Sequence, residues 1–204
     1  MENTICTNDI EILFEDGDIL VINKPVGILS EDSQKGEKGI ITYLQNENRK
    51  ALHLLHRLDR EVGGVMVFAK NKKSASILST DIANGKFYKS YLAVTDGIPE
   101  SDEGVYKDLL FKDSKKNRSF VVNRMRKGVR KASLEYVILK KSEKNALVRV
   151  LLHTGRTHQI RVQFSSRKTP LTGDGRYGSK VRDCSIALYF PYLSYTTHCF
   201  ERLL

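Results

Sequence analysis

Four short segments between residues 105 and 152 decide the fold class: VYKDLLF (105–111), SFVVNR (119–124), ASLEYVILK (132–140) and ALVRVLL (146–152). Apolar and polar residues alternate along them, which is typical of strands that bury one face. Charged turns separate the segments, and short turns join neighbouring antiparallel strands. The stretch therefore predicts an antiparallel sheet.

Further strands are predicted on the N-terminal side of this stretch. The segment EILFEDGDILVINKP (11–25) places two apolar runs around Asp16-Gly17, a dipeptide that favours a tight hairpin turn. VMVFA (65–69) is predicted to be a short buried strand, and FYKSYLAV (87–94) a longer one.

Helices are predicted at three places along the chain. Residues 72–84 follow Asn71, a good N-cap, and precede Gly85, a typical stop signal. Residues 157–165 have an apolar edge with helical spacing, and residues 40–48 could form a short helix. Strands with a few helices predict an α+β fold: a mixed, mostly antiparallel β-sheet core with flanking helices.

Length and composition narrow the class of protein further. A chain of 204 residues predicts one domain with a core of its own, and it contains no apolar run long enough to span a membrane. The acidic N-terminus lacks the pattern of a signal peptide. Three widely spaced cysteines do not suggest a disulfide framework. We therefore expect a cytoplasmic protein with reduced thiols and no membrane association.

Positive charge is concentrated in one segment. The chain carries 34 Lys and Arg against 24 Asp and Glu, a formal net charge of +10. Residues 112–131 contain nine basic residues and one acidic residue, so this basic segment carries +8 of that charge. Such a concentration suits a polyanion such as nucleic acid or an anionic membrane surface. A solvated, charged hairpin without a ligand is the alternative.

The first candidate site is His56-Arg57-Leu58-Asp59-Arg60. A carboxylate between Arg57 and Arg60 should stay ionised, because nearby positive charge favours the charged form. An ionised aspartate can act as a nucleophile, a general base or a metal ligand. A structural ion pair in a loop is the alternative interpretation of Asp59.

The second candidate site is TGRTHQIR (154–161), where Gly155 interrupts a strand just before a predicted helix. Arg156 and Arg161 bring fixed positive charge to this turn, although exposed arginines at an ordinary helix start would look the same. The histidines lack metal-ligand spacing such as HExxH, so no metal site is expected. The glycine-rich LTGDGRYG (171–178) has no Gly-Lys-Ser/Thr and is predicted to be a tight loop.

Taken together, these motifs resemble the RluA-type RNA pseudouridine synthases. HRLDREVGGVMVFAKN (56–71) is similar to the catalytic motif of that family. Four other stretches agree in order: EILFEDGDILVINKPVGILS (11–30), KSYLAV (89–94), LLHTGRTHQIRVQ (151–163) and PLTGDGRYG (170–178). The chain departs from the family where Val62-Gly63 stands in place of the usual Thr-Ser, which removes two hydroxyl groups, whereas Gly64 is kept.

The resemblance implies a pseudouridine synthase fold and the isomerisation of uridine to pseudouridine in ribosomal or transfer RNA. It implies that Asp59 is the nucleophile and that Arg161 is the partner that keeps it ionised. Tyr91 would offer a flat face on which the uracil stacks. Tyr88 has the opposite strand parity and is not expected in the pocket.

The resemblance also suggests supporting residues around the flipped nucleotide. Arg57 is expected near that nucleotide, with His56 and Arg156 as neighbours and Ile160 as an apolar wall. The reaction needs neither cofactor nor metal. We expect a monomeric, stand-alone catalytic domain over residues 1–204, without a separate N-terminal RNA-binding domain.

Two other functions remain open at this point. A non-enzymatic RNA-binding module could retain the fold, and a glycosidase-like hydrolase could use Asp59. Glycosidases usually need two carboxylates flanking the bond, whereas the second motif here supplies arginine. Tritium release from RNA labelled at uridine C5 separates the three functions.

Overall fold

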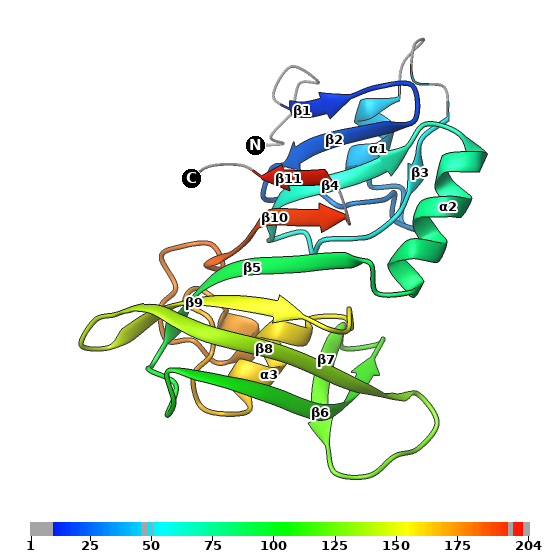
Figure 1. Cartoon of the computed structure of the whole chain (residues 1–204). Helices are drawn as coiled ribbons and strands as arrows, with labels where there is room; N and C mark the ends of the chain where they lie inside the picture. The colour runs from blue at the N-terminus through cyan, green and yellow to red at the C-terminus, as the bar shows by residue number, and fades with distance from the viewer. Residues whose placement is uncertain (1–9, 46–48, 50, 196–197, 202–204) are drawn as a thin grey trace. The chain divides into compact units, whose positions relative to one another are not determined.

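The computed structural model describes residues 10–45, 49, 51–195 and 198–201 (Figure 1). The chain divides into two compact units: residues 1–87 with 190–204 form the first, and residues 88–189 form the second. Each unit consists of a mostly antiparallel sheet and short helices. The fold is therefore α+β, as the sequence predicted.

The sheet of the first unit has the strand order β1-β2-β4-β10. These strands are β1 (Glu11–Glu15), β2 (Ile19–Lys24), β4 (Gly63–Ala69) and β10 (Leu188–Tyr195), of which the residues from Phe190 onward belong to this unit. The short strands β3 (His53–Leu54) and β11 (His198–Glu201) pair with β4 and β10. The helix α2 (Lys72–Ala83) packs against β3 and β4, and α1 (Ile40–Leu44) precedes β3 in the chain (Figure 1).

Local side-chain bonds explain the predicted turn and helix start. The Asp16 carboxylate accepts hydrogen bonds from the backbone N–H groups of Asp18 and Ile19, both at 2.7 Å, and so closes the hairpin between β1 and β2. The side chain of Asn71 accepts from the backbone N–H of Ser74 at 2.9 Å and caps α2. Both predictions are confirmed, with α2 ending one residue earlier than predicted.

The sheet of the second unit has the strand order β5-β9-β8-β6-β7. The strands are β5 (Phe87–Asp96), β6 (Glu103–Asp113), β7 (Arg118–Val122), β8 (Val129–Lys141) and β9 (Asn145–Leu152), and the neighbours in this order pair antiparallel. The four alternating segments of the sequence are thus confirmed as β6 to β9. The helix α3 (Gln159–Ser165) packs against β6 and β7, and a short 3-10 helix, η2 (Gly175–Tyr177), follows in the glycine-rich loop.

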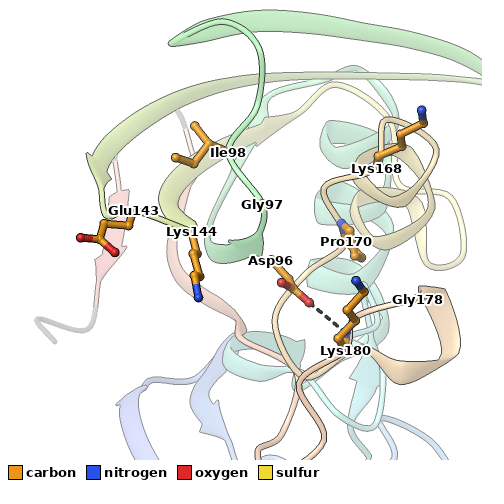
Figure 2. A pocket seen from close by; sticks show the side chains of 9 residues that line it. All are labelled: Asp96, Gly97, Ile98, Glu143, Lys144, Lys168, Pro170, Gly178 and Lys180. Carbon is orange, nitrogen blue, oxygen red and sulfur yellow. Dashed lines mark hydrogen bonds between the residues drawn. The ribbon is translucent and has the colours of Figure 1, made fainter.

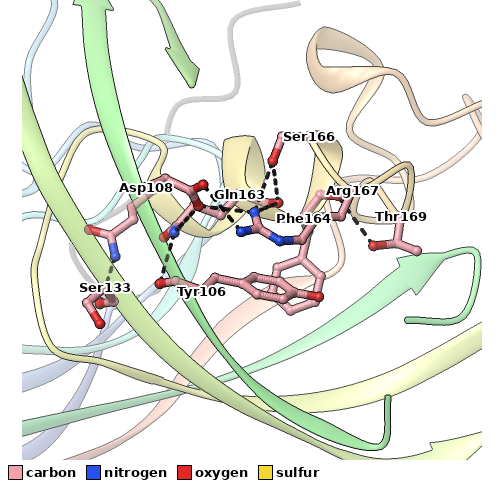
Figure 3. Close-up of polar contacts among 9 residues, drawn as sticks. Tyr106, Asp108, Ser133, Gln163, Phe164, Ser166, Arg167 and Thr169 are labelled. Carbon is pink, nitrogen blue, oxygen red and sulfur yellow. Dashed lines mark hydrogen bonds and ion pairs between the residues drawn. The ribbon is translucent and has the colours of Figure 1, made fainter. Parts of the chain in front are cut away.

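An ion pair between Arg167 and Asp108 joins the chain just after α3 to β6 (Figure 3). Arg167 donates to both carboxylate oxygens of Asp108 at 3.0 and 3.2 Å, and its guanidinium lies 3.8 Å from the ring centre of Tyr106. The helix begins at Gln159 rather than at residue 157, because His158 has a left-handed backbone with φ of 53°. These contacts hold the short helix that carries two of the candidate site residues, Ile160 and Arg161.

Some strands and one helix end were not predicted as the structure has them. The sequence patterns predicted neither the two-residue β3 nor the C-terminal strands β10 and β11. The predicted helix over 40–48 ends at Leu44, and residues 46–48 lie outside the described part of the chain. Within that described part, the helices are too short to cross a membrane.

Candidate functional site

Asp59 lies half-buried in the loop between β3 and β4 of the first unit. The residues on both sides of it are held by their backbones. The backbone N–H of Leu58 donates to the Ser30 hydroxyl at 3.0 Å, and that hydroxyl donates to the Leu58 carbonyl at 2.8 Å. The carbonyl of Arg60 accepts from the Gly27 N–H at 2.8 Å. Asp59 therefore stands on a fixed stretch of backbone, as a reacting group requires.

Lys24, the last residue of β2, is a fully buried cation close to this loop. Its ammonium donates to the carbonyl oxygens of Pro25 at 2.8 Å and Arg60 at 3.4 Å. Burial lowers the pKa of Lys24 to about 8, while the negative charge of Asp59 acts in the opposite direction. Lys24 is therefore mostly protonated at pH 7 and supplies positive charge to the Asp59 loop.

The two arginines that flank Asp59 in the sequence have acidic partners of their own. Arg57 is exposed and forms an ion pair with Glu31 at 2.5 Å. Arg60 pairs with Glu37, also at 2.5 Å. The glutamates therefore offset part of the positive charge that was expected to act on Asp59. The buried positive charge of Lys24 was not predicted. The Asn-Lys-Pro at the end of the opening hairpin was the signal that could have pointed to it.

The ring of His56 is held by the sheet of the first unit. Its Nε2 accepts from the backbone N–H of Val67 at 3.3 Å, and its edge meets the ring of Phe190 at a centroid distance of 5.8 Å. Gly64 has φ of +133°, and a Cβ there would lie 2.3 Å from the Phe190 carbonyl oxygen. Only glycine fits this close approach of β4 to β10.

Tyr91 lies on β5 in the second unit, opposite Val150 of β9. It is 8% exposed, whereas Tyr88 is 56% exposed, in agreement with their opposite parity. Lys89 has the same parity as Tyr91, and burial lowers the pKa of its ammonium. Lys89 belongs to the KSYLAV motif, but the sequence patterns predicted no role for it.

Arg161 is buried in the second unit with an acidic partner that was not predicted. Its Nε donates to Asp174 Oδ2 at 2.6 Å, and its Nη2 donates to Oδ1 at 3.0 Å. The two side chains are 2% and 0% exposed. Asp174 comes from the glycine-rich loop, where Gly173 has φ of +79° and a Cβ would lie 2.3 Å from the Ser185 carbonyl oxygen. The loop is therefore shaped to bring Asp174 to Arg161.

The remaining candidates of the second motif have contrasting environments. Arg156 is exposed, and its Nε donates to the Lys131 carbonyl at 3.0 Å. Ile160 is buried on α3. The structure thus brings His56, Arg57 and Asp59 together in one loop of the first unit. In the second unit, Ile160 and Arg161 lie on α3, Arg156 lies just before this helix, and Tyr91 lies on β5.

The basic segment of residues 112–131 covers β7, its two turns and the neighbouring ends of β6 and β8. The Asp113 carboxylate accepts from the backbone N–H groups of Lys115 and Lys116 at 2.9 and 3.0 Å and so shapes the first turn. Arg118 is half-buried, and the other basic side chains of the segment are exposed. The segment thus presents its charge to solvent.

A pocket of about 460 Å³ opens elsewhere in the second unit, and its lining includes Asp96, Lys144 and Lys180 (Figure 2). The predicted site residues are not part of this lining. The Asp96 carboxylate accepts from the Ser179 hydroxyl and the Lys180 backbone N–H, both at 2.9 Å, which lowers its pKa. Asp96 therefore has a structural task. Across the described residues, no group of three or more His, Cys, Asp or Glu could hold a metal ion.

Comparisons with known proteins agree with the motifs. Residues 18–166 match the family described as RNA pseudouridylate synthase. The chain is 34% identical over 180 residues to the Bacillus subtilis protein named "Uncharacterized RNA pseudouridine synthase YhcT", covering 83% of this chain and 58% of that protein. It is 36% identical over 179 residues to a "Ribosomal large subunit pseudouridine synthase C" of Buchnera aphidicola, covering 86% of this chain and 56% of that protein.

A solved structure shares the fold over nearly the whole chain. The human RNA Pseudouridylate Synthase Domain Containing 4 superposes with a TM-score of 0.81 and 25% identity, covering 95% of this chain and 88% of that one. The chain spans less than three fifths of the length of the two bacterial relatives above. The Asp59 motif lies within residues 18–166, which the family model matches.

Proposed function

Because the chain belongs to the RNA pseudouridylate synthase family, we propose that it isomerises specific uridines of structured RNA to pseudouridine. In this reaction the bond between C1′ and N1 breaks, a bond from C5 to C1′ forms, C5 loses its proton and N1 gains one. The observation that carries the proposal is Asp59, a half-buried carboxylate on a backbone fixed at both neighbours, inside the family's motif. The name of the Buchnera relative favours ribosomal RNA over transfer RNA as the substrate.

Asp59 is the nucleophile in this proposal, since its ionised carboxylate can form the covalent bond to the nucleotide. Lys24 donates a hydrogen bond to the carbonyl of Arg60, and its positive charge favours the ionised form of the Asp59 carboxylate. The target uridine must first leave its stack, which costs a few kcal/mol. Arg57, exposed in the same loop, contacts the flipped nucleotide in this proposal, and the half-buried His56 precedes it in the chain.

The residues of the second unit bind the substrate in this proposal. Tyr91 offers its ring to the detached uracil, which must be kept while it turns. Arg161 supplies a fixed positive charge whose position is set by Asp174. Ile160 forms an apolar wall for the uracil, and Arg156 adds positive charge just before the N-terminus of α3.

The basic segment binds RNA phosphates in this proposal, since exposed Lys and Arg side chains bind the phosphates of RNA whatever its nucleotide sequence. The reaction involves no redox change or hydrolysis, so the chemistry calls for no cofactor and no metal. Residues 1–204 act as one catalytic domain, as a monomer in the cytoplasm, where the three cysteines stay reduced. A non-enzymatic RNA-binding module would use the same basic segment without needing the fixed Asp59 loop.

Pseudouridine mapping tests the function in cells. Total RNA from cells with the protein, without it and with only Asp59→Asn is compared at each uridine. The proposal expects one or a few positions, in ribosomal RNA first, to lose pseudouridine in both altered strains. Identical maps in all three strains would rule out the proposed activity on cellular RNA. Loss of pseudouridine only in transfer RNA would show that transfer RNA, not ribosomal RNA, is the substrate.

A further inference from the structure

Tyr177 lies at the centre of the contacts around Arg161, although neither the sequence motifs nor the proposed reaction give it a task. It is the last residue of η2 and is almost completely buried. Its ring centre lies 5.1 Å from the guanidinium carbon of Arg161 and, equally, 5.1 Å from that of Arg118. One ring is therefore shared by the buried arginine of the candidate site and by the half-buried arginine of the basic segment.

The hydroxyl of Tyr177 is engaged in two directions. It accepts from the backbone N–H of Ser119 on β7 at 2.8 Å, and it lies 2.9 Å from Nδ1 of His158. Burial raises the pKa of the phenol, so the hydroxyl keeps its proton at neutral pH. The oxygen can accept from Ser119 while its hydrogen is donated to an unprotonated Nδ1 of His158.

Both ends of α3 depend on the same tyrosine. His158 is the residue before the helix and has the left-handed backbone that starts it, three residues before Arg161. At the other end, the Ser165 hydroxyl donates to the Tyr177 carbonyl at 2.5 Å. The tyrosine thus contacts the residue that starts the helix, the residue that ends it and the guanidinium in its middle.

We infer that Tyr177 is a positioning residue for the reaction, which holds the Arg161 guanidinium in place by its ring and by its hydroxyl bonds to β7 and His158. Asp174 binds the Nε and Nη2 edge of that guanidinium, whose carbon lies over the Tyr177 ring at 5.1 Å from the ring centre. A charged group must be held to within about 0.5 Å to be productive in catalysis. The inference rests on the proposed function, since it assigns Tyr177 an effect on that chemistry.

The variant Tyr177→Phe tests the hydroxyl alone, because the ring and its contacts remain. The expected result is a fall in kcat of about tenfold at saturating RNA, as a displacement well below 1 Å would cause. The Kd for RNA should stay within about twofold, since phosphate contacts determine it. Tritium release from C5-labelled RNA gives kcat, and a binding isotherm gives Kd.

Tyr106→Phe is the matched control. Tyr106 is also a buried tyrosine whose ring faces an arginine, but that arginine is Arg167, paired with Asp108. Both variants lose one buried hydroxyl and should lose similar stability. A purely structural Tyr177 would leave kcat unchanged in both, whereas the inference expects a loss only in Tyr177→Phe.

A double variant shows whether Tyr177 acts through Arg161. In an Arg161→Lys background, where the guanidinium is gone, Tyr177→Phe should cost less than about a further twofold in kcat. His158→Asn is a second single variant, which removes one of the two partners of the Tyr177 hydroxyl and keeps the tyrosine itself. Asparagine tolerates the left-handed backbone of this position, so a partial loss of kcat, about threefold, is expected without unfolding.

The outcomes separate this inference from the proposed function. Wild-type protein that releases no tritium from any RNA substrate removes the proposed function, whatever the variants do. An active wild type with unchanged kcat in Tyr177→Phe and His158→Asn overturns the inference and leaves the function intact. A full tenfold loss that persists in the Arg161→Lys background would also overturn it, because Tyr177 would then act by another route.

Discussion

Two arginine–aspartate pairs, one in α3 and one just after it, consist of the same residue types but have different surroundings. Arg161 with Asp174 is 2% and 0% exposed and has Tyr177 against it. Arg167 with Asp108 is 32% and 12% exposed and has Tyr106 against it. Arg167 also donates to the Gln163 carbonyl and the Ser166 hydroxyl, so it joins the end of the helix to β6 (Figure 3).

The difference in burial suggests different roles for the two pairs. A buried ion pair loses much of its solvation, and well-packed apolar residues of the same volume are often as stable. Stability alone therefore does not explain the Arg161 pair. A partly exposed pair costs less to form and serves well as a clip between two elements. We therefore propose that the Arg161 pair serves the reaction and that the Arg167 pair joins α3 to β6.

Removing one acid from each pair gives the largest expected effect on stability. Asp174→Asn removes the buried carboxylate that pairs with Arg161 and should destabilise the protein by about 3–5 kcal/mol. Asp108→Asn leaves a partly solvated Arg167 with its other acceptors and should cost about 1 kcal/mol. Urea denaturation of both variants measures the two losses. Equal losses would remove the distinction between the pairs.

Replacing the whole buried pair sharpens the same comparison. Arg161→Met combined with Asp174→Leu removes both charges and keeps the volume. Stability should return to within about 1 kcal/mol of wild type, because no buried charge is left unpaired. Tritium release should not recover. Recovery of activity along with stability would show that the pair is a structural element only.

A second buried cation, Lys24, extends the comparison to the first unit. Its pKa is about 8 in the folded protein and 10.5 when unfolded, so between these values the unfolded state binds more protons. Stability must then rise with pH across this window, and the charged form costs the fold up to about 3 kcal/mol below pH 8. The difference in unfolding free energy between wild type and Lys24→Met, measured from pH 7 to pH 10, should grow in favour of wild type. A difference that does not vary with pH contradicts the assigned burial of the charge.

Much of the fold follows from local patterns, and the site only in part. The turn at Asp16-Gly17 and the cap at Asn71 were predictable because each depends on neighbours within three residues. The family's motifs made Asp59 and Arg161 candidates, and their roles stay predictions. The partner of Arg161 was not predicted, because Asp174 lies thirteen residues away and reaches it only through the folded loop.

The remaining errors have physical causes of their own. Strand β10 contains Pro191, which cannot donate to a sheet and so argues against a strand in the sequence. The buried state of Lys24 was hidden because lysine is rarely found in a core, and only tertiary packing reveals it. The start of α3 was placed two residues early because the left-handed backbone of His158 has no signature in the pattern.

Replacing Arg161 or Arg167 by lysine should affect the reaction rate, and less strongly than the removal of the aspartates affects stability. Lysine keeps the charge and loses the two-pronged geometry. Arg161→Lys should retain only part of the activity, with a loss of about tenfold, because the bidentate bond to Asp174 cannot be reproduced. Arg167→Lys should remain within about twofold of wild type. Initial rates at saturating RNA decide, and similar rates in the two variants would place Arg161 outside the reaction.

Substitutions in the basic segment should have the smallest effect on kcat and should weaken RNA binding instead. Replacing Lys115, Lys116, Arg126 and Lys127 by Gln should flatten the slope of log affinity against log salt by roughly two to three units, because each neutralised phosphate of a single strand contributes about 0.7 to that slope. Affinity should fall alike for cognate and non-cognate RNA, and kcat should be nearly unchanged.

A set of lysines elsewhere on the second unit controls for net charge. Gln at the exposed positions Lys140, Lys144, Lys168 and Lys180 makes the same change in charge outside the basic segment. This control should leave the salt slope close to wild type. A wild-type slope in the basic-segment variant would show that the segment does not bind RNA phosphates.

The central claim, that Asp59 is the nucleophile of a uridine isomerisation, is tested most directly by tritium release from RNA labelled at uridine C5. Wild type should release tritium, and Asp59→Asn should release less than about a thousandth as much while binding RNA within a few-fold. Glu61→Gln, which removes a carboxylate two residues away in the same loop, should stay active. Turnover by Asp59→Asn above that level, or none by wild type on any RNA, would contradict the claim.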